Sequence, residues 1–415
     1  MAEVSTQSGS VAALDTETGA ARAVATLGLM LFLSMVPVTL LVAPLKELVG
    51  VRYGAGSFWT HSFMSINMVG AILASPLIAL LSDSGAVRRR VASVALAADA
   101  VLLSAMNVAP SLKWLLLLRF FEGAAHILAI STLMAIAAGW ATDSRRGRTM
   151  GIVGSAMMLG TACGTRLGGE VWKHLPGSVF LVSGLISVAA SAVVLFLVRE
   201  APGTDRPRRS IRDVAALLRT RGALLVAYAY AFVDRFCVGV VVSTLVLFFA
   251  DVHGLEPAAR GRLLVLFLVP FALLVYPAGR LADRIGRAWP LAAGSALFGV
   301  VFGAYGYAST EAMALLMVLS GVVSAVMFAP NLALCADLAP AEGRGAAFTG
   351  FNIAGSVGFL LGPLAGGLFY AAAARHMAEA SAYRLTFLAT GATEVLCAAV
   401  TLPFLLRLRR RGMTR

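Results

Sequence analysis

Long apolar segments alternate with short polar ones along the whole chain. A helix needs about 20 predominantly apolar residues to cross about 30 Å of hydrocarbon. Six such segments come first, at 23–44, 58–81, 91–108, 114–140, 150–172 and 179–198. After a polar, arginine-rich stretch over 199–221, six more follow at 223–250, 263–281, 288–307, 313–338, 348–373 and 385–406. The pattern predicts an all-α membrane protein with twelve transmembrane helices.

The second half of the chain repeats the first. Four glycines recur 198 positions later: Gly160, Gly164, Gly168 and Gly169 return as Gly358, Gly362, Gly366 and Gly367. Small residues of this kind let helix backbones approach closely. The repeat predicts two pseudo-symmetric six-helix halves, 23–198 and 223–406. We expect a disordered cytoplasmic tail over 1–22, a basic cytoplasmic linker over 199–222 and a basic cytoplasmic tail over 407–415. Parallel repeats are typical of transporters whose halves rock about a site between them.

Composition and charge agree with this class. Of the 415 residues, 59% are hydrophobic and 13% are charged, which is more apolar surface than a soluble core can hide. Most of the 34 Lys and Arg residues lie in loops on the side of the two termini, and the opposite loops hold eight. Because basic residues are retained in cytoplasmic loops, we expect both termini to be cytoplasmic. The net charge of +13 then reflects topology and contact with anionic lipid headgroups, and we expect no nucleic-acid partner.

One loop carries a specific motif. The segment 279–287, G-R-L-A-D-R-I-G-R, lies between the eighth and ninth predicted helices. It resembles the signature loop of the major facilitator superfamily, G-x-L-A-D-R-x-G-R, at every defined position. The equivalent loop between helices two and three keeps Asp83 but departs from the pattern elsewhere. The resemblance extends over the whole chain and implies a transporter with the fold of this family.

The resemblance also implies a gating role for the motif residues, which are Asp83, Gly279, Asp283, Arg284, Gly286 and Arg287. An aspartate at the start of a helix meets the positive end of the helix dipole. It can also pair with an arginine on the facing half and so latch one conformation. A tight turn with arginines that only set the topology is the alternative interpretation.

The fourth predicted helix carries charges at membrane depth. Arg119, Glu122 and His126 are spaced i, i+3 and i+7, so they form a stripe on one helix face. A charge at mid-bilayer costs on the order of 3 kcal/mol, so the stripe has to pair internally or line water. The segment resembles the R-x-x-x-G segment of drug/proton antiporters, which implies a proton-linked switch in which Glu122 titrates and Arg119 holds its charge. A structural ion pair with a satisfied histidine is the alternative.

Helix five carries the antiporter pattern G-x-x-x-G-P-x-x-G-G in an altered form. Thr165 replaces the proline and Arg166 follows it, whereas helix eleven keeps Pro363 and the intact pattern. This departure weakens the assignment as an antiporter. Two interpretations of Arg166 stay open: it binds an anionic group in the central cavity through bidentate hydrogen bonds, or it pairs with Glu170 one turn on.

Helix seven contains Asp234 and Arg235, which point about 100° apart and therefore cannot both face the cavity. We expect Asp234 to be the cavity carboxylate and a further proton-coupling candidate, with Arg235 bridging to another helix. By resemblance, helices three and twelve are scaffold elements, so we expect Asp99 and Glu394 to pair structurally. The remaining cavity candidates are Asn67, Tyr228, Tyr230, Asn331 and Asn352. Residues of these types in membrane helices more often serve helix packing.

The expected function is proton-coupled efflux of a small organic or amphipathic compound by alternating access, carried out by a monomer in a bacterial inner membrane. A proton-coupled uptake symporter for an organic anion is the main alternative, favoured by three intramembrane arginines. A lipid-translocating protein or a non-transporting scaffold is the third. The chain has no Walker loop, nucleophile elbow or metal-spaced His/Cys cluster, so we expect no enzymatic activity, cofactor or metal. The expected partners are a small-molecule substrate, protons and membrane lipids.

Overall fold

The computed structural model describes residues 22–83, 88–140, 146–200, 211–340 and 343–410. Within these ranges the chain is almost entirely helical and forms no strand. Two six-helix bundles follow one another along the chain, which confirms the predicted all-α, twelve-helix architecture. The expected tails fall mostly outside the described ranges.

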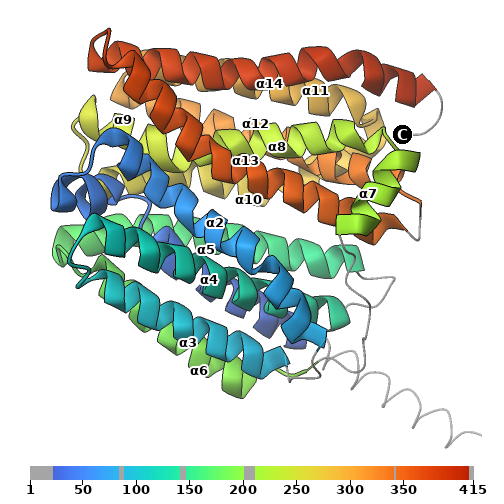
Figure 1. Cartoon of the computed structure of the whole chain (residues 1–415). Coiled ribbons are helices and arrows are strands. Elements are labelled where there is room, and N and C mark those ends of the chain that lie inside the picture. The colour runs from blue at the N-terminus through green and yellow to red at the C-terminus, as the bar shows by residue number, and fades with distance from the viewer. Residues whose placement is uncertain (1–21, 84–87, 141–145, 201–210, 341–342, 411–415) are drawn as a thin grey trace, which may run out of the picture.

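The N-terminal half begins with the helix Arg22–Thr39, which ends in a turn over 40–44 and continues as the π-helix η1 (Lys46–Val51). The other helices of this half are α2 (Ser57–Asp83), α3 (Arg88–Met106), α4 (Leu112–Trp140), α5 (Arg146–His174) and α6 (Val179–Leu197). α3 packs against α4 and α6, and α2 packs against α4. Figure 1 shows this half, coloured blue to green, as one bundle.

The C-terminal half begins with α8 (Leu224–Val240), which runs through the π-helix η2 (Val241–Leu245) into α9 (Val246–Asp251) as one crossing. It is completed by α10 (Pro257–Ile285), α11 (Ala288–Ala304) with the short η3 (Tyr305–Tyr307), α12 (Thr310–Leu338), α13 (Arg344–Ala373) and α14 (Glu379–Arg410). The π-helices η1 and η2 occupy matching places in the first crossing of each half, whereas η3 is a 3-10 helix. Nine of the described helices are long and apolar enough to span a membrane by composition alone.

The linker contains a helix that the sequence analysis did not predict. α7 (Ile211–Thr220) packs against α13 of the C-terminal half. Val214 is buried, and Leu217 packs against the same apolar core. Their i, i+3 spacing places them on one face of the helix, and this spacing was the signal that could have revealed α7.

The repeated glycines hold equivalent helix pairs together. Gly160 lies against the carbonyl of Phe32 in the first helix and Gly168 against that of Leu40 in the turn that follows, where any side chain would overlap them. In the second half, Gly358 lies in the same way against the carbonyl of Phe232 on α8. These glycines therefore lie where two helix backbones approach closely. The physical reason is that only a residue without a Cβ permits this backbone distance.

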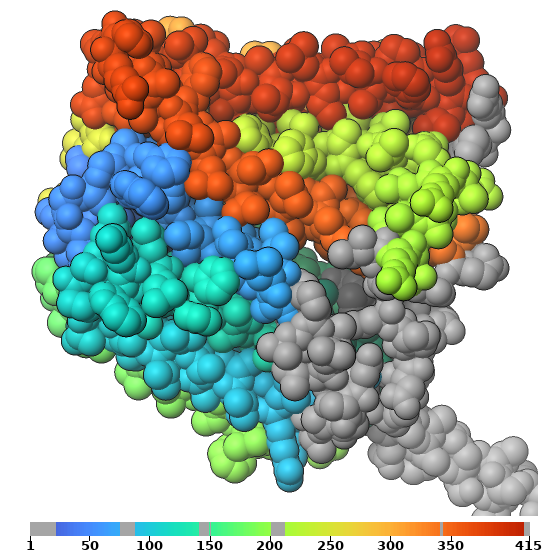
Figure 2. Space-filling model, in the orientation of Figure 1, coloured from blue at the N-terminus to red at the C-terminus, as the bar shows by residue number. Residues whose placement is uncertain are grey.

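The halves meet through α2 against α13 and α5 against α10. We call the side holding η1 and α9 the far side, and the side holding Arg22, α7 and Arg410 the terminal side. Space-filling atoms of the two halves touch along the far side (Figure 2). Toward the terminal side, a carbon added to Gly151 or Gly154 on α5 would meet no atom of the described residues within 4 Å. The described contacts therefore indicate two halves that are closed against each other on the far side.

Candidate functional site

The helix-four stripe is buried inside the N-terminal half. Arg119 and Glu122 are both 0% exposed, and Arg119 Nη1 donates to Glu122 Oε2 at 2.8 Å. The Arg119 guanidinium also lies over the ring of Phe63 on α2, 5.0 Å from its centroid. His126 on the same face is 8% exposed. The predicted stripe is thus brought together and paired internally.

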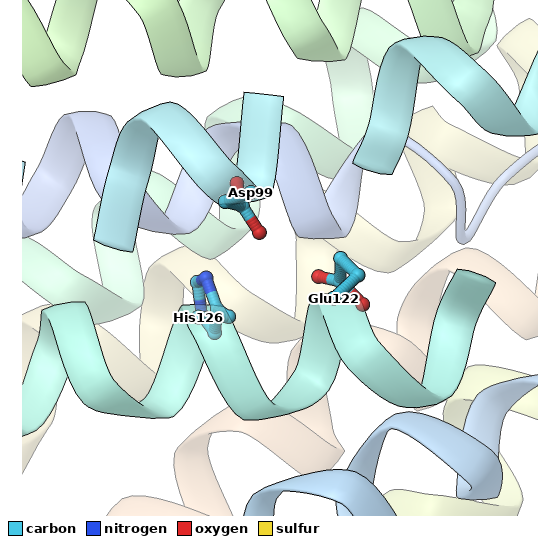
Figure 3. A group of neighbouring side chains, drawn as sticks. All are labelled: Asp99, Glu122 and His126. Atoms are coloured by element: carbon cyan, nitrogen blue, oxygen red, sulfur yellow. The ribbon is translucent and has the colours of Figure 1, made fainter. Parts of the chain in front are cut away.

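Asp99 joins this cluster from α3, although the sequence analysis assigned it to the scaffold. One ligand atom each of Asp99, Glu122 and His126 lies within 4.8 Å of the others (Figure 3). Ser187 on α6 donates to Asp99 Oδ2 at 2.7 Å, which is the structural pairing expected for this residue. The proximity to Glu122 was not expected, because sequence spacing alone does not tell which face of α3 meets α4.

The C-terminal half holds a matching acid-serine pair. There the acid lies on the last helix of the half and the serine on the third, the reverse of the N-terminal half. Ser295 on α11 donates to Glu394 on α14, as Ser187 on α6 does to Asp99 on α3. Glu394 is 0% exposed, so the predicted structural pairing of this residue is present. Cys237 on α8 packs near the same place, within sulfur hydrogen-bond range of the Thr390 carbonyl.

On α8 the exposures of the adjacent charges are the reverse of those expected. The side chain of Arg235 is 40% exposed and that of Asp234 is 14% exposed, with 3.8 Å between Arg235 Nε and Asp234 Oδ2. The guanidinium of Arg235 lies 5.7 Å from the ring centroid of Phe328 on α12, and its stem lies beside Gly355 on α13. A guanidinium cannot stay exposed to hydrocarbon. In this conformation Arg235 is the more exposed of the two charges, and the cavity role of Asp234 stays a prediction.

Arg166 forms an ion pair with Glu170, which is the second of the two interpretations given above. It donates to Glu170 one turn on, and the two side chains are 36% and 27% exposed. Its backbone lies beside Gly261 on α10, at the junction of the halves. The pairing occupies the guanidinium in this conformation.

The other cavity candidates divide by burial. Asn67, Tyr228, Tyr230 and Asn331 are all less than 8% exposed. Tyr228 donates to the carbonyl of Ala347 on α13, and the hydroxyl of Tyr230 accepts from Thr401 on α14. In this conformation both tyrosine hydroxyls make contacts between packed helices, and the cavity role expected for them stays a prediction. Of the five, only Asn352 is exposed.

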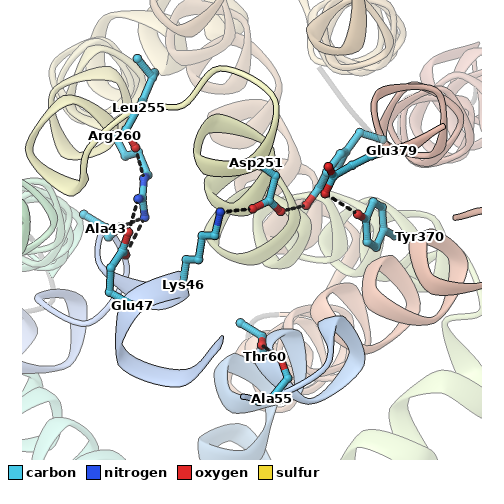
Figure 4. Close-up of polar contacts among 11 residues, drawn as sticks. Ala43, Lys46, Glu47, Ala55, Thr60, Asp251, Leu255, Arg260, Tyr370 and Glu379 are labelled. Atoms are coloured by element: carbon cyan, nitrogen blue, oxygen red, sulfur yellow. Dashed lines mark hydrogen bonds and ion pairs between the residues drawn. The ribbon is translucent and has the colours of Figure 1, made fainter. Parts of the chain in front are cut away.

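A buried ion pair closes the far side, and no sequence motif indicated it. Arg260 on α10 is 2% exposed and donates to both carboxylate oxygens of Glu47 on η1 (Figure 4). Its Nη1 also donates to the carbonyl of Ala43 at 2.9 Å, and its Nε to the carbonyl of Leu255 at 2.8 Å. The turn over 40–44 directs the Ala43 carbonyl away from the helix ladder, which is why a guanidinium from the other half can reach it.

A second, more exposed pair lies beside it. Lys46 Nζ and Asp251 Oδ1 are 2.5 Å apart, and the lysine side chain is 36% exposed. Tyr383 on α14 donates to the other oxygen of Asp251 at 2.5 Å. Burial lowers the pKa of His253 in the following loop, so that ring is neutral near pH 7. His253 therefore adds no positive charge beside the two ion pairs.

The motif loop on the terminal side is held within its own half. Arg287 pairs with Asp283 at 3.4 Å and also with Asp337 on α12. Gly286 ends α10 with φ at +89°, a conformation that only glycine adopts without strain. Asp283 is 58% exposed. The side chain of Asp83 lies outside the described residues, so a latch across the halves stays a prediction.

Removing Arg260 is expected to open the far side. In Arg260→Gln the carboxylate of Glu47 stays buried without its partner while the halves are closed, but is hydrated once they part. Breaking a buried pair costs about 3–5 kcal/mol, so the ratio of closed to open molecules should fall by more than about a hundredfold. Leu175 and Met377 are exposed loop residues on the far side, one in each half. With the native cysteines replaced, spin labels at these two positions report the distance between the halves.

Lys46→Gln is the matched control. This pair is partly exposed and should contribute less than about 1 kcal/mol, so the label distances should change little. Equal effects of the two substitutions would contradict the assignment of Arg260 as the main closing contact.

The sequence of this chain is similar to those of known proteins. The family model described as Major Facilitator Superfamily matches residues 21–259 and 224–414. "Probable anion transporter 7" of Oryza sativa subsp. japonica is 33% identical over 103 residues, 25% of this chain and 24% of that protein. "Uncharacterized MFS-type transporter YfkF" of Bacillus subtilis (strain 168) is 28% identical over 260 residues, 62% of this chain and 65% of that protein. The match thus spans about a quarter of the rice relative's length and less than two thirds of the Bacillus one.

Solved structures show a similar fold at low identity. A bacterial homolog of the human lysosomal transporter Spinster, in an inward-facing and unoccupied conformation, has a TM-score of 0.77 at 16% identity, covering 92% of this chain and 96% of that one. The nucleoside transporter NupG has a TM-score of 0.75 at 12% identity, covering 92% of this chain and 99% of that one. At these identities the likeness concerns the fold alone.

Proposed function

Because the chain belongs to the Major Facilitator Superfamily, we propose that it is a proton-coupled secondary transporter of an organic anion. Its two halves rock about a site between them, so that the site opens alternately to each side of the membrane. The terminal side carries most of the basic residues and is the cytoplasmic side in this proposal. The protein works as a monomer in a bacterial inner membrane, and proton and anion move together toward the cytoplasm.

Arg235 carries the proposal. It lies where α8, α12 and α13 meet, and 40% of its side chain is exposed at a depth where hydrocarbon would exclude it. The nearest carboxylate, Asp234, is 3.8 Å away and belongs to the adjacent residue, which leaves most of the guanidinium fork for a ligand. A planar guanidinium is suited to a carboxylate or phosphate group. Two relatives described as probable anion transporters support an anionic substrate.

Efflux of an amphipathic compound in exchange for protons remains the second candidate. The wall beside Arg235 is aromatic, since Phe328 packs edge-to-face against Phe271 on α10 at 5.6 Å between centroids. Phe271 in turn stacks on Phe267. Such a wall suits the apolar part of an amphipathic molecule. The two candidates differ in whether charge recognition at Arg235 is required.

A thermal-shift screen on the purified protein separates them. The panel contains monocarboxylates, dicarboxylates, sugar acids and phosphate esters, with lipophilic cations and neutral amphiphiles as the comparison set. We expect stabilising compounds to be anions, and Arg235→Gln to weaken their binding by about tenfold to a hundredfold, the cost of a lost charge-assisted hydrogen bond. Arg235→Lys should retain part of the affinity, because the charge remains.

Transport of a stabilising anion into proteoliposomes then tests direction and coupling. Accumulation should require a pH gradient that is acidic on the side from which the anion enters. Stabilisation by cations or neutral amphiphiles that survives Arg235→Gln would instead favour the exporter.

A further inference from the structure

We propose that Asp99 and Glu122 form one proton-binding site, a carboxyl pair that shares a single proton inside the N-terminal half. The inference deepens the proposed function, since it names the group that would carry the coupled proton. It also identifies Asp99, from the scaffold helix α3, as a member of the site.

The two carboxyl groups face each other with half of their oxygens unpaired. Ser187 donates to Asp99 Oδ2, and Arg119 donates to Glu122 Oε2. The other oxygens, Asp99 Oδ1 and Glu122 Oε1, are buried and have no hydrogen-bond partner among the described residues. Figure 3 shows both side chains directed into the same space between α3 and α4. A proton placed between them would let one carboxyl donate to the other.

Charge counting leads to the same conclusion. With both carboxylates ionised, the cluster would hold two negative charges and only the positive charge of Arg119, all at 0–1% exposure. Two carboxylates this close and this deeply buried cannot both ionise at low cost, and one shared proton removes the excess charge. The titration then belongs to the pair and not to either residue. The charged and titratable groups facing the site are Arg119 and His126 from α4 and Asp99 from α3.

His126 offers the next position for the proton. It is 92% buried, its Nδ1 has no partner among the described residues, and it lies within reach of both carboxyls. It stands one turn nearer to the terminal side than Glu122 and is the most exposed member of the group. A neutral imidazole in this place can accept a proton from the pair and release it toward the terminal side.

The site is connected to the contact between the halves through α2. Arg119 packs on Phe63 of α2, and two residues further along Ser65 donates to the carbonyl of Leu360 on α13 at 2.8 Å. Loss of the shared proton makes Arg119 the counter-ion of two carboxylates in place of one. A change in its position is therefore transmitted to α2, which packs against α13 at the contact between the halves.

Infrared spectra of the full-length protein in lipid bilayers test the shared proton. At neutral pH the wild type should show a protonated-carboxyl carbonyl band that shifts in heavy water. Asp99→Asn and Glu122→Gln should each remove the same one-proton band, because the remaining carboxyl then ionises beside Arg119. The double variant should lose no more than either single one. Glu394→Gln, which removes the buried acid of the other half, should leave this band in place.

Absence of the band in the wild type, its loss in only one single variant, or additive losses would overturn the proposal. If Asp99→Asn does not fold, Ser187→Ala keeps both carboxyls and should shift the band by removing a hydrogen bond to Asp99, and an unshifted band would count against the pair. Displacement of the band by Mn²⁺ or Na⁺ at constant pH would make the cluster a cation site. If transport is driven by the gradient but the band is absent, the carboxyl pair is contradicted and the proposed function stands. If the band is present but transport is not driven by the gradient, the proposed function is contradicted and the carboxyl pair stands.

Discussion

Gly169→Val is expected to keep the far side from closing. Any carbon added at Gly169 on α5 would overlap the carbonyl of Pro257 and lie 2.7 Å from the Cα of Ala258, both on α10 of the other half. Overlap with backbone cannot be relieved by a rotamer change, so the halves have to separate. Overpacking of this kind costs about 1–3 kcal/mol, which shifts the conformational equilibrium by about five- to 150-fold. The distance between spin labels at Leu175 and Met377 should lengthen, and transport should slow without loss of the fold.

Two substitutions on the same helix control this prediction. Gly151→Val places its side chain where no atom in the described part of the chain lies within 4 Å, so the label distance across the far side should not lengthen. Gly168→Val instead collides with Leu40 of the same half and should lower thermal stability. An unchanged label distance in Gly169→Val would mean that the twin glycines serve packing only within each half.

Glu122→Gln is expected to uncouple transport from the proton gradient. The variant keeps the shape of the side chain and removes the group that titrates between Arg119 and Asp99. With one proton per anion, a gradient of one pH unit supports an about tenfold concentration ratio, because one pH unit corresponds to about 1.4 kcal/mol. We expect this ratio to fall to about one in proteoliposomes, while exchange of labelled for unlabelled anion continues, since binding at Arg235 is unaffected.

Asp234→Asn is the comparison for coupling. Its side chain is 14% exposed and lies on the other half, far in sequence from the cluster. If Asp234→Asn alone abolishes the gradient-driven ratio and Glu122→Gln keeps it, the helix-four cluster is structural and coupling belongs to α8.

The sequence indicated only part of the contact between the two halves. The twin glycines Gly168–Gly169 and Gly366–Gly367 predicted close packing, but not that the two members of a pair serve different neighbours. Gly168 contacts the first helix of its own half, and Gly169 contacts α10 of the other half. Gly367 likewise lies 2.8 Å, measured from an added Cβ, from the Cβ of His61 on α2. Adjacent helix positions point about 100° apart, so consecutive glycines can line two interfaces at once.

The sequence by itself determined the class, the number of helices, the two halves and the burial of Arg119 with Glu122. These follow from the length of apolar runs, a repeat and helical spacing, which are local properties that a bilayer enforces on every residue. Only the tertiary structure decided that Asp99 meets Glu122, that Arg235 and not Asp234 is the exposed charge, and that Arg260 reaches Glu47. Those contacts join residues from different helices. They depend on how each helix is rotated about its axis, and rotation is set by packing against neighbours rather than by the helix's own sequence.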